Sequence, residues 1–460
     1  MINGTSQQVG LDPVNSDDAT WILTASFVIF TMQTGFGLLE SGAVTKKNEV
    51  NIMMKNAADI ILGGLTYWMY GYGLQYGTGP GTNPFCGVGS FFLDADTENM
   101  GIVFATFIFQ LSFATTATTI VSGAMAERTD FNAYCVFSFL NTIVYCIPAG
   151  WLWGNHGFLK KMGAIDFAGS AAVHLLGGIS ALVAASMLKP RLRRYDNGID
   201  PLPMGNPINA IVGAFTLWWG WLVFNCGSTF GISNHKWHYA ARAAVTTINA
   251  SVAGGFVGLV NSYRRNRMFL VGDIINSILG ALVGVTAGSA FYHPWEAILV
   301  GALGAFLVIE FQPLLDKVKV DDPVGAVAVH GIGGLWGMLA VGLLVDDDPL
   351  LNLTKGYKGV FKGGGFYIFG VQTLTCVVIG LWSALTTYTI LKVINIFLPI
   401  RMPLSEETLG ADFTEHDIRH DGYNYERIIE ELLGQGLKTH TDRSHAPPRT
   451  EWDTYLIEKY

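Results

Sequence analysis

The chain has 460 residues, of which half are hydrophobic and only 14% are charged, and its formal net charge is −8. Because a water-soluble protein carries about a quarter charged residues, this composition excludes an ordinary soluble enzyme, and the negative balance gives no reason to expect nucleic acid as a partner. Apolar segments of about 20 residues recur along almost the whole chain, which is typical of a polytopic helical membrane protein surrounded by lipid.

Residues 1–18 are expected to form an extracellular N-terminal arm. They contain no Lys or Arg, so they lack the positively charged start of a cleavable signal peptide. We therefore expect the first apolar segment to remain in the membrane. Asn3-Gly4-Thr5 is a glycosylation sequon, which makes Asn3 a candidate site and the protein a candidate glycoprotein.

The apolar runs predict an all-α fold with eleven transmembrane helices. The last run is longer than a perpendicular crossing needs, so we expect a long, steeply tilted helix 11. Residues 19–398 form the expected membrane domain, and the polar tail, 399–460, is expected to be an appendage without a second folded domain. The predicted spans are 19–39, 57–77, 101–126, 131–155, 167–188, 207–231, 238–260, 268–291, 294–311, 324–345 and 366–398.

The basic residues of the connecting loops predict the orientation of the chain. An odd number of spans places the two termini on opposite sides of the membrane. With the N-terminus outside, the inward loops hold 13 Lys and Arg and the outward loops hold six. Because positively charged loops remain in the cytosol, we expect an external N-terminus and a cytosolic C-terminus.

Two stretches of the chain, Asp166 to His174 and Asp322 to His330, repeat one pattern. Asp, Gly at +3, Val at +7 and His at +8 agree, and a Gly-Gly pair follows in both. The histidines lie in predicted spans 5 and 10, so the repeating unit has five spans and must insert in opposite directions. Inverted repeats of this kind are common in transporters and channels, where the substrate path lies between the halves. The two halves run over 19–188 and 207–345.

The two histidines are the first functional candidates, because an ionisable side chain inside a membrane is costly. Two facing imidazoles can hydrogen-bond each other and line a narrow lumen, since a neutral ring has a donor and an acceptor. A purely structural pair is one alternative. A metal site is another, but zinc usually has three or four ligands, so we expect no metal and no cofactor.

The two aspartates of the repeat call for different interpretations. Asp322 precedes Pro323, the order typical of a helix start, and we expect it to cap the helix. Asp166 is the better functional candidate, as a supporting carboxylate that makes an outer vestibule attractive to cations.

Aromatic residues near the outward ends of several spans form a second pattern. Phe113 lies in span 3, Trp153 ends span 4, and Trp221, Phe224 and Ser228 lie in span 6. Aromatic faces beside a hydroxyl suit a small cation that gives up its water, through cation–π attraction and one hydrogen bond. A large or anionic substrate would require Lys or Arg near the middle of the spans. The two basic residues that lie within spans, Arg242 and Lys392, are both near span ends.

Five ordered motifs together carry a resemblance to a known family. The chain resembles the ammonium transporter (Amt/Mep/Rh) family over about residues 17–425. Within that family it resembles the ammonium-transporter branch, and its sequence is of the eukaryotic type. The motifs are Asp166-Phe-Ala-Gly…Val-His174, Asp321-Asp322-Pro…Val-His330-Gly, Phe-Asn-Cys-Gly-Ser228, Gly-Ala-Met-Ala-Glu127-Arg128 and Gly-Phe-Gly-Leu-Leu-Glu40-Ser-Gly.

The resemblance implies a homotrimer of eleven-helix subunits, with an inverted five-plus-five repeat and one pore through each subunit. The substrates it implies are ammonium, ammonia and methylammonium. Trp153 and Ser228 favour the ammonium-transporter branch over the Rhesus branch, which generally lacks such a vestibule. One departure is Ser170, where a second glycine is common. The implied site residues are Trp153, Phe113, Ser228 and Trp221 for recruitment, Phe113 and Phe224 for a phenyl gate, and His174 and His330 for the lumen.

The tail stretch Leu409-Gly-Ala-Asp-Phe-Thr414-Glu-His also resembles the family's regulatory C-terminal motif. In plant members the matching threonine can be phosphorylated to close all three pores. Thr414 is therefore a candidate phosphosite, and a kinase or regulatory protein acting on the tail is a candidate partner.

The expected function is transport of ammonium across the plasma membrane, and the protein is not expected to be an enzyme. A Rhesus-like channel for NH3 or CO2 and an ammonium sensor that signals through its tail are alternatives. A membrane metalloenzyme is a third, although no predicted span contains a His-x3-His pair.

Overall fold

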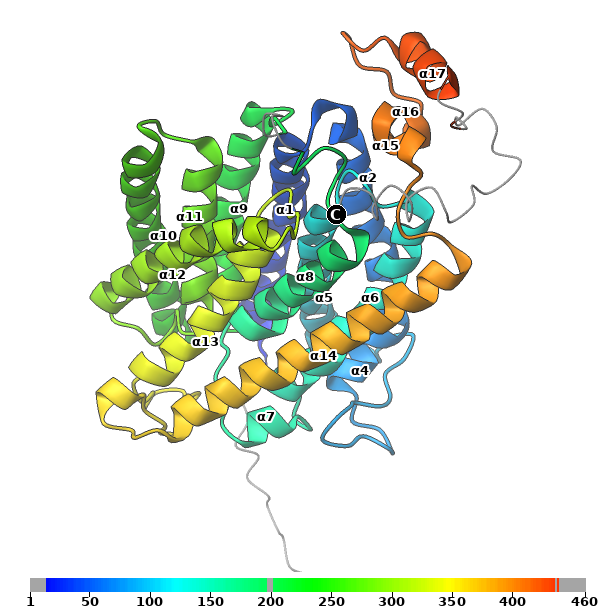
Figure 1. Cartoon of the computed structure of the whole chain (residues 1–460). Helices are drawn as coiled ribbons and strands as arrows, with labels where there is room; N and C mark the ends of the chain where they lie inside the picture. Colours follow the sequence, from blue (N-terminus) through cyan, green and yellow to red (C-terminus); the bar gives the residue numbers. More distant parts are fainter. Residues whose placement is uncertain (1–13, 197–201, 435–436, 438–460) are drawn as a thin grey trace, which may run out of the picture.

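The structure, a computed structural model, describes residues 14–196, 202–434 and 437, so the candidate glycosylation site Asn3 lies outside the described residues. Within this part the chain is helical, and its only β-type pairing is an isolated bridge between Thr129 and Arg401. The prediction of an all-α membrane fold is confirmed. The elements form a bundle with the C-terminal helices on one side (Figure 1).

The first half of the chain contains α1 (Ser16–Ala43), η1 (Lys46–Asn48), α2 (Glu49–Ala58), η2 (Asp59–Gly63), α3 (Gly64–Thr66), η3 (Tyr67–Gly71), α4 (Tyr72–Tyr76), α5 (Met100–Met125), α6 (Phe131–Trp153), α7 (Phe158–Lys161), η4 (Ser170–Leu175) and α8 (Leu176–Leu188). The second half contains α9 (Pro207–Gly227), α10 (Lys236–Asn266), α11 (Val271–Thr286), α12 (Pro294–Lys317), η5 (Val327–Ile332), α13 (Gly333–Leu344), η6 (Val360–Lys362) and α14 (Tyr367–Phe397). The tail contains α15 (Leu404–Leu409), α16 (Ala411–His416) and α17 (Tyr425–Gly434).

The predicted spans can be compared with these helices one by one. In the described part, nine helices are long and apolar enough to cross a membrane, and α11 is a shorter apolar helix in the place of predicted span 8. Predicted span 2 corresponds to the continuous series from α2 to α4, which begins earlier than predicted because α2 is rich in polar residues. The count of eleven transmembrane helices stays a prediction.

Side chains at the helix starts explain several of these boundaries. Asn15 accepts a hydrogen bond from the Asp18 amide at 2.8 Å and caps α1. Asp130 caps α6 in the same way, and Asn206 caps α9 immediately before Pro207. Such caps satisfy backbone N–H groups that have no partner within the helix, and proline in the first turn has no N–H to satisfy.

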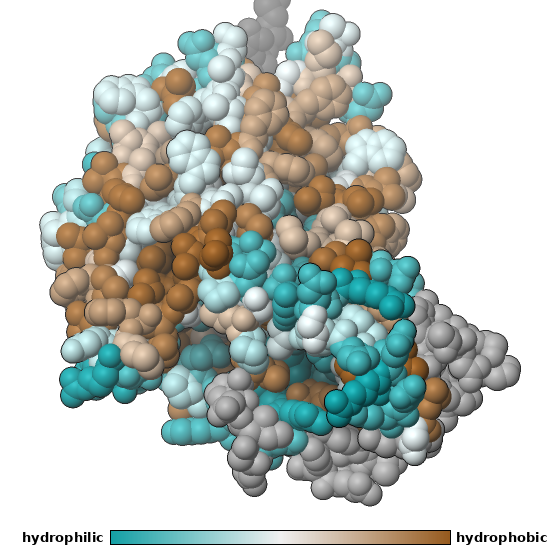
Figure 2. All heavy atoms as spheres, turned by 90° about the horizontal axis from the view of Figure 1, so that it is seen from above, coloured by the Kyte–Doolittle hydropathy of each residue, from teal (hydrophilic) through white to brown (hydrophobic). Residues whose placement is uncertain are grey.

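The flank of the bundle is hydrophobic where a soluble protein would be polar. Large apolar side chains are exposed on the long helices, among them Phe256 on α10, Trp295 on α12 and Leu385 on α14. Seen from the side of the tail, hydrophobic residues cover much of the outline and hydrophilic residues gather at the lower right, beside the grey atoms (Figure 2). Because lipid accepts apolar side chains at no cost, this surface fits a membrane protein.

Helix α14 has 31 residues and runs obliquely across the outside of the bundle (Figure 1). It packs on α6, α8 and α13. A helix of this length spans about 46 Å at 1.5 Å per residue, which exceeds the roughly 30 Å hydrocarbon core. Its oblique course therefore agrees with the tilt expected for the last span.

The two halves pack against each other reciprocally. Each helix of the repeat begins with a π-helical turn, η4 or η5, and continues as an α-helix, α8 or α13. η5 packs on α8, and η4 packs on α13. The contact is close because glycines line it: a Cβ on Gly178 would collide with the backbone of Gly331, and one on Gly334 would collide with the backbone of Ser170.

The tail folds back onto the bundle, which the interpretation as a mere appendage did not anticipate. Leu409, Tyr425 and Leu432 form a small hydrophobic cluster of their own. The Asp412 carboxylate accepts hydrogen bonds from the backbone amides of Val50 and Asn51, at 3.1 and 2.7 Å, in the first turn of α2. The tail helices lie at one end of the bundle (Figure 1).

We predict that Gly178→Leu prevents correct assembly of the two halves. The added side chain would meet the Gly331 backbone, and overpacking a close-packed core costs about 1–3 kcal/mol or more. The expected result is a lower melting temperature and less monodisperse protein in size-exclusion chromatography in detergent. Gly370→Leu is the matched control, because no atom lies within 4 Å of its Cβ position. Equal stability of the two variants would contradict the prediction.

Candidate functional site

A cavity of about 330 Å³, which we call the Trp153 cavity, includes Lys160 of α7 in its lining. Helix α7 lies on the opposite side of the bundle from the tail helices (Figure 1). Phe113, Trp153 and Ser228 line the cavity together, although they come from α5, α6 and the end of α9. The Trp153 and Phe113 rings meet edge to face, with centroids 5.9 Å apart. The Trp153 indole N–H donates to the Asp166 carbonyl at 2.8 Å, which fixes the ring.

The Ser228 hydroxyl donates its proton to the Phe224 carbonyl at 2.8 Å. Its oxygen is therefore left as an acceptor toward the cavity. An acceptor oxygen beside two aromatic rings is an arrangement that attracts a small cation with N–H groups.

Two phenyl rings close the floor of the Trp153 cavity. Phe113 and Phe224 are stacked, with ring centroids 4.0 Å apart and planes at 15°. Both side chains are buried, at 1% and 0% exposure. At this centroid distance the two rings are in van der Waals contact, so nothing passes between them unless one ring moves.

The two histidines meet directly beyond the phenyl stack. His174 and His330 face each other with Nδ1 atoms 3.2 Å apart, ring centroids 5.2 Å apart and planes at 19°. The Phe224 and His174 centroids are 5.7 Å apart, so the phenyl stack and the imidazole pair are consecutive. A hydrogen bond between two Nδ1 atoms makes one ring the donor and the other the acceptor.

The π-helical turns are the local feature that presents these rings. His174 lies in η4 and His330 in η5, at corresponding positions of the repeat. A π-turn widens the helix locally and is frequent at functional sites. Neither turn is predicted by the sequence, because the residues of both keep the apolar pattern of an ordinary helix.

Trp221 does not join the residues around the Trp153 cavity, where the sequence analysis expected it. It is fully buried and stacks on the His174 ring, with centroids 4.8 Å apart. Its indole N–H donates to the Thr286 hydroxyl at 3.0 Å. Trp221 precedes Phe224 by nearly one turn of α9, and this offset places it at the level of the histidines rather than above the phenyl rings.

Asp166 and Asp322 have the same structural role, although the sequence analysis separated them. Asp322 accepts from the Gly325 and Val327 amides at 3.1 and 2.7 Å, so it is a helix cap. Asp166 lies at the wall of the Trp153 cavity, but its carboxylate is 5% exposed and faces the backbone. Its two oxygens accept from the amides of Gly169, Ser170, Ala171 and Ala172, at 2.8 to 3.0 Å.

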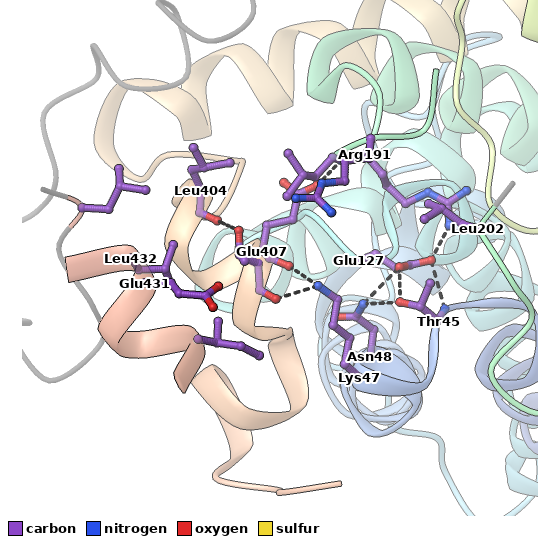
Figure 3. A pocket seen from close by; sticks show the side chains of 15 residues that line it. Thr45, Lys47, Asn48, Glu127, Arg191, Leu202, Leu404, Glu407, Glu431 and Leu432 are labelled. Carbon is purple, nitrogen blue, oxygen red and sulfur yellow. Dashed lines mark hydrogen bonds and ion pairs between the residues drawn. The ribbon is translucent and has the colours of Figure 1, made fainter. Parts of the chain in front are cut away.

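On the side of the tail, a second cavity of about 410 Å³ lies between the tail and the neighbouring loops (Figure 3). Lys47 points across it and donates to the Glu407 carbonyl at 2.6 Å. The Asn48 side chain donates to the Glu127 carboxylate at 3.0 Å. The tail is held to the first loop of the bundle by the Lys47 contact and by the Ala411 amide, which donates to the Asn48 side-chain oxygen at 2.9 Å.

Hydrogen bonds connect this interface to the start of the His330 helix. Glu407 accepts from the Leu192 amide at 2.6 Å. The adjacent Arg191 pairs with Asp321 at 2.8 Å, and Asp321 precedes the cap residue Asp322. Burial raises the pKa of Asp321, but the charges of Arg191 and Arg128 and the hydrogen bonds from Arg191 together lower it more, so the pKa lies well below its ordinary value.

Among the residues that the structure describes, no group of three or more His, Cys, Asp or Glu side chains is placed to hold a metal ion. The site is therefore an aromatic cavity, a phenyl stack and an imidazole pair in series, without a metal centre in the described part of the chain.

Comparisons with known proteins identify the family that the chain resembles. Residues 20–420 match the model of the Ammonium Transporter Family. The chain is 41% identical to putative ammonium transporter 3 of Caenorhabditis elegans, over 98% of this chain and 66% of that protein, slightly less than two thirds of its length. It is 40% identical to putative ammonium transporter 2 of the same organism, over 89% and 82% of the two chains. A solved structure titled "Sensor Amt Protein" matches with a TM-score of 0.79 and 30% identity, over 87% and 98%.

We predict that Asp166→Ala destabilises the protein more than Asp322→Ala. The first change leaves four backbone amides without their acceptor and the second leaves fewer, and each unmet buried donor costs about 1–3 kcal/mol. The measurement is the melting temperature of the purified variants in one detergent. A smaller shift for Asp166→Ala than for Asp322→Ala would contradict this account of the caps.

Proposed function

The chain belongs to the ammonium transporter family, and we propose that it carries ammonium across the plasma membrane through the path that begins at the Trp153 cavity. The observation that carries the proposal is the serial order of the site: a cation-attracting cavity, then the Phe113–Phe224 stack, then the His174–His330 pair. In this assignment the cavity faces the outside and the tail lies in the cytosol.

Recruitment of ammonium and exclusion of alkali ions follow from the chemistry of the Trp153 cavity and of the Phe113–Phe224 stack. Ammonium reaches the aromatic faces of Trp153 and Phe113 and donates a hydrogen bond to Ser228. Methylammonium can make the same contacts. Na+ and K+ need many oxygen ligands to replace their water, and the stacked phenyl rings offer none. Alkali ions therefore stop at the phenyl rings.

Ammonium can pass this barrier because it can release its proton to the solvent of the Trp153 cavity and continue as NH3. Neutral NH3 loses far less hydration energy than a bare cation on entering an apolar passage. Beyond the rings, His174 and His330 offer nitrogen atoms along the lumen, and the buried His174 Nε2 has no hydrogen-bond partner in the described part of the chain. NH3 can hydrogen-bond to such an atom, and the imidazole pair provides a route by which the proton can follow.

We predict that replacing both histidines, His174→Ala with His330→Ala, lowers ammonium and methylammonium flux at least about tenfold, because losing the hydrogen bonds of the lumen costs roughly 1.4 kcal/mol or more. Flux is measured with labelled methylammonium in proteoliposomes, and size-exclusion chromatography checks the assembly. Full activity of the double variant would rule out the imidazole pair as the lumen.

We further propose that the active form is a homotrimer in lipid with one pore in each subunit. The support from this chain is the apolar flank, which includes exposed side chains such as Phe256 and Trp295. In the trimer, part of this flank packs against neighbouring subunits and the remainder faces lipid.

Ammonium sensing is a second candidate function. It is favoured by the likeness to a structure titled as a sensor and by the hydrogen-bonded connection from Asp322 to the tail residue Glu407. The two functions are distinguished by recording ammonium flux and the accessibility of the tail to protease, each with and without ammonium. In a sensor, ammonium changes the protease accessibility of the tail without sustained flux.

We propose that phosphorylation of Thr414 releases the tail and closes the pore. Thr414 is 1% exposed, and its hydroxyl donates to the Gly410 carbonyl at 3.2 Å. A phosphate carries nearly two negative charges and does not fit this buried position beside Asp412. The modification therefore requires α16 to leave α2 and a kinase that acts on the transiently released tail.

We predict that Thr414→Asp reduces ammonium flux at least about fivefold. The buried, unpaired charge destabilises the docked position of α16 and favours the released, closed form. A fivefold ratio corresponds to roughly 1 kcal/mol, which is less than the cost of burying such a charge. Thr414→Val, which keeps the shape of the side chain, is the matched control and is expected to keep most of the flux. The measurement is methylammonium uptake per molecule at the cell surface. A Thr414→Asp form that transports as well as the native chain would exclude the switch.

A further inference from the structure

One buried carboxyl group near the path has no role in the function proposed so far. Glu40 lies on α1 one turn after Phe36, whose ring centroid is 6.1 Å from that of His330. Residues four apart lie on the same face of a helix. Because α1 runs toward the side of the tail (Figure 1), Glu40 lies beyond the histidines, on the far side from the Trp153 cavity.

A small cavity connects the two side chains. It holds about 10 Å³ and is lined by Phe36, Glu40, Val324 and His330, with apolar residues completing the wall. Such a volume is on the scale of one water molecule, and ammonia or ammonium is of similar size. Glu40 and His330 are the polar side chains among the described residues of this lining.

The two oxygens of Glu40 differ in their surroundings. Oε2 accepts from the Asn56 amide at 2.7 Å and from the Ser122 hydroxyl at 2.8 Å. Oε1 receives no hydrogen bond within the part of the chain that the structure describes, although the side chain is only 2% exposed. A carboxyl oxygen that accepts no hydrogen bond from the protein keeps its lone pairs available to a bound donor.

The neighbouring helix leaves room for Oε1. A Cβ atom on Gly123 of α5 would lie 2.9 Å from Oε1 and would also crowd Val324. Because glycine has no side chain, the oxygen remains open toward the cavity instead of being covered. Asp59 and Lys55 of the neighbouring span are the charged groups that act on Glu40 electrostatically.

We propose that Glu40 forms an inner substrate site, in which Oε1 accepts a hydrogen bond from ammonia leaving His330 and serves as the counter-charge for ammonium or a small alkylammonium ion. The inference rests on the proposed function. Asn56 and Ser122 hold Oε2 and thereby aim Oε1 at the cavity. The Glu40 site is the inner counterpart of the Trp153 cavity. The Trp153 cavity offers aromatic faces and the Ser228 acceptor, and the inner site offers the Glu40 carboxyl acceptor on the other side of the imidazole pair.

The test compares labelled methylammonium flux in sealed membrane vesicles of both orientations. Glu40→Gln keeps the shape of the side chain and removes its charge. We expect it to raise the half-saturating concentration from the inner side about tenfold, the loss expected for a charge-assisted hydrogen bond, and to change the outer value less than about twofold.

Two further variants keep the test decisive. Asp59→Asn is the matched control, because Asp59 is also a buried carboxylate, bonded to Tyr134 and Ser138, but does not line the cavity. Because Asp59 acts on Glu40 only through its like charge, removing that charge is expected to leave the inner half-saturating concentration equal or lower, without the rise expected for Glu40→Gln. Glu40→Asp keeps the charge, and we expect an inner value within about threefold of the native one.

The outcomes separate the two levels of the proposal. If the native chain shows no saturable flux in either orientation, the proposed function fails. If the native chain transports and Glu40→Gln shifts both sides equally or neither side, the inner site is wrong while the function stands. A tenfold inner loss in Glu40→Asp also overturns the inner site, and so does the same one-sided shift in Asp59→Asn.

Discussion

The contact on which the path depends is the crossing of the two repeat helices at their glycines. The backbone at Gly178 lies against Gly331, and the backbone at Gly334 lies against Ser170 and Leu175. This crossing brings two histidines from opposite halves of the chain to a hydrogen-bonded distance. Larger side chains there would separate the helices, and the two imidazole rings would no longer meet.

A second constraint is that the interior must satisfy its polar groups without water. The loops before η4 and η5 cross into the bundle, and Asp166 and Asp322 bind the free amides of the two helix starts. These carboxylates are therefore part of the support for the histidines, about two turns away. The Glu40 and Asp59 carboxyl groups accept hydrogen bonds from side chains instead, from Asn56 and Ser122 and from Ser138.

The position of the tail gives the path a physical connection to the outside of the bundle. Glu407 bonds to the Leu192 amide, Arg191 pairs with Asp321, and Asp321 adjoins the cap of the His330 helix. Separately, Asp412 caps α2, the helix whose Asn56 holds Glu40. Short hydrogen bonds thus connect the tail both to the start of the helix that carries His330 and to the helix that holds Glu40.

The sequence by itself determined the membrane class, the position of most helices and the family, because hydropathy and ordered motifs are local properties of the chain. The repeated Asp-to-His pattern also predicted that the two histidines share a site. Only the tertiary structure decided that Trp221 stacks on His174 instead of lining the Trp153 cavity. It also decided that the Asp166 carboxylate accepts hydrogen bonds from backbone amides, and that Glu40 and His330 line one small cavity. These facts depend on helix rotation, on π-turns and on distances between segments far apart in the chain, and one-dimensional patterns do not contain them.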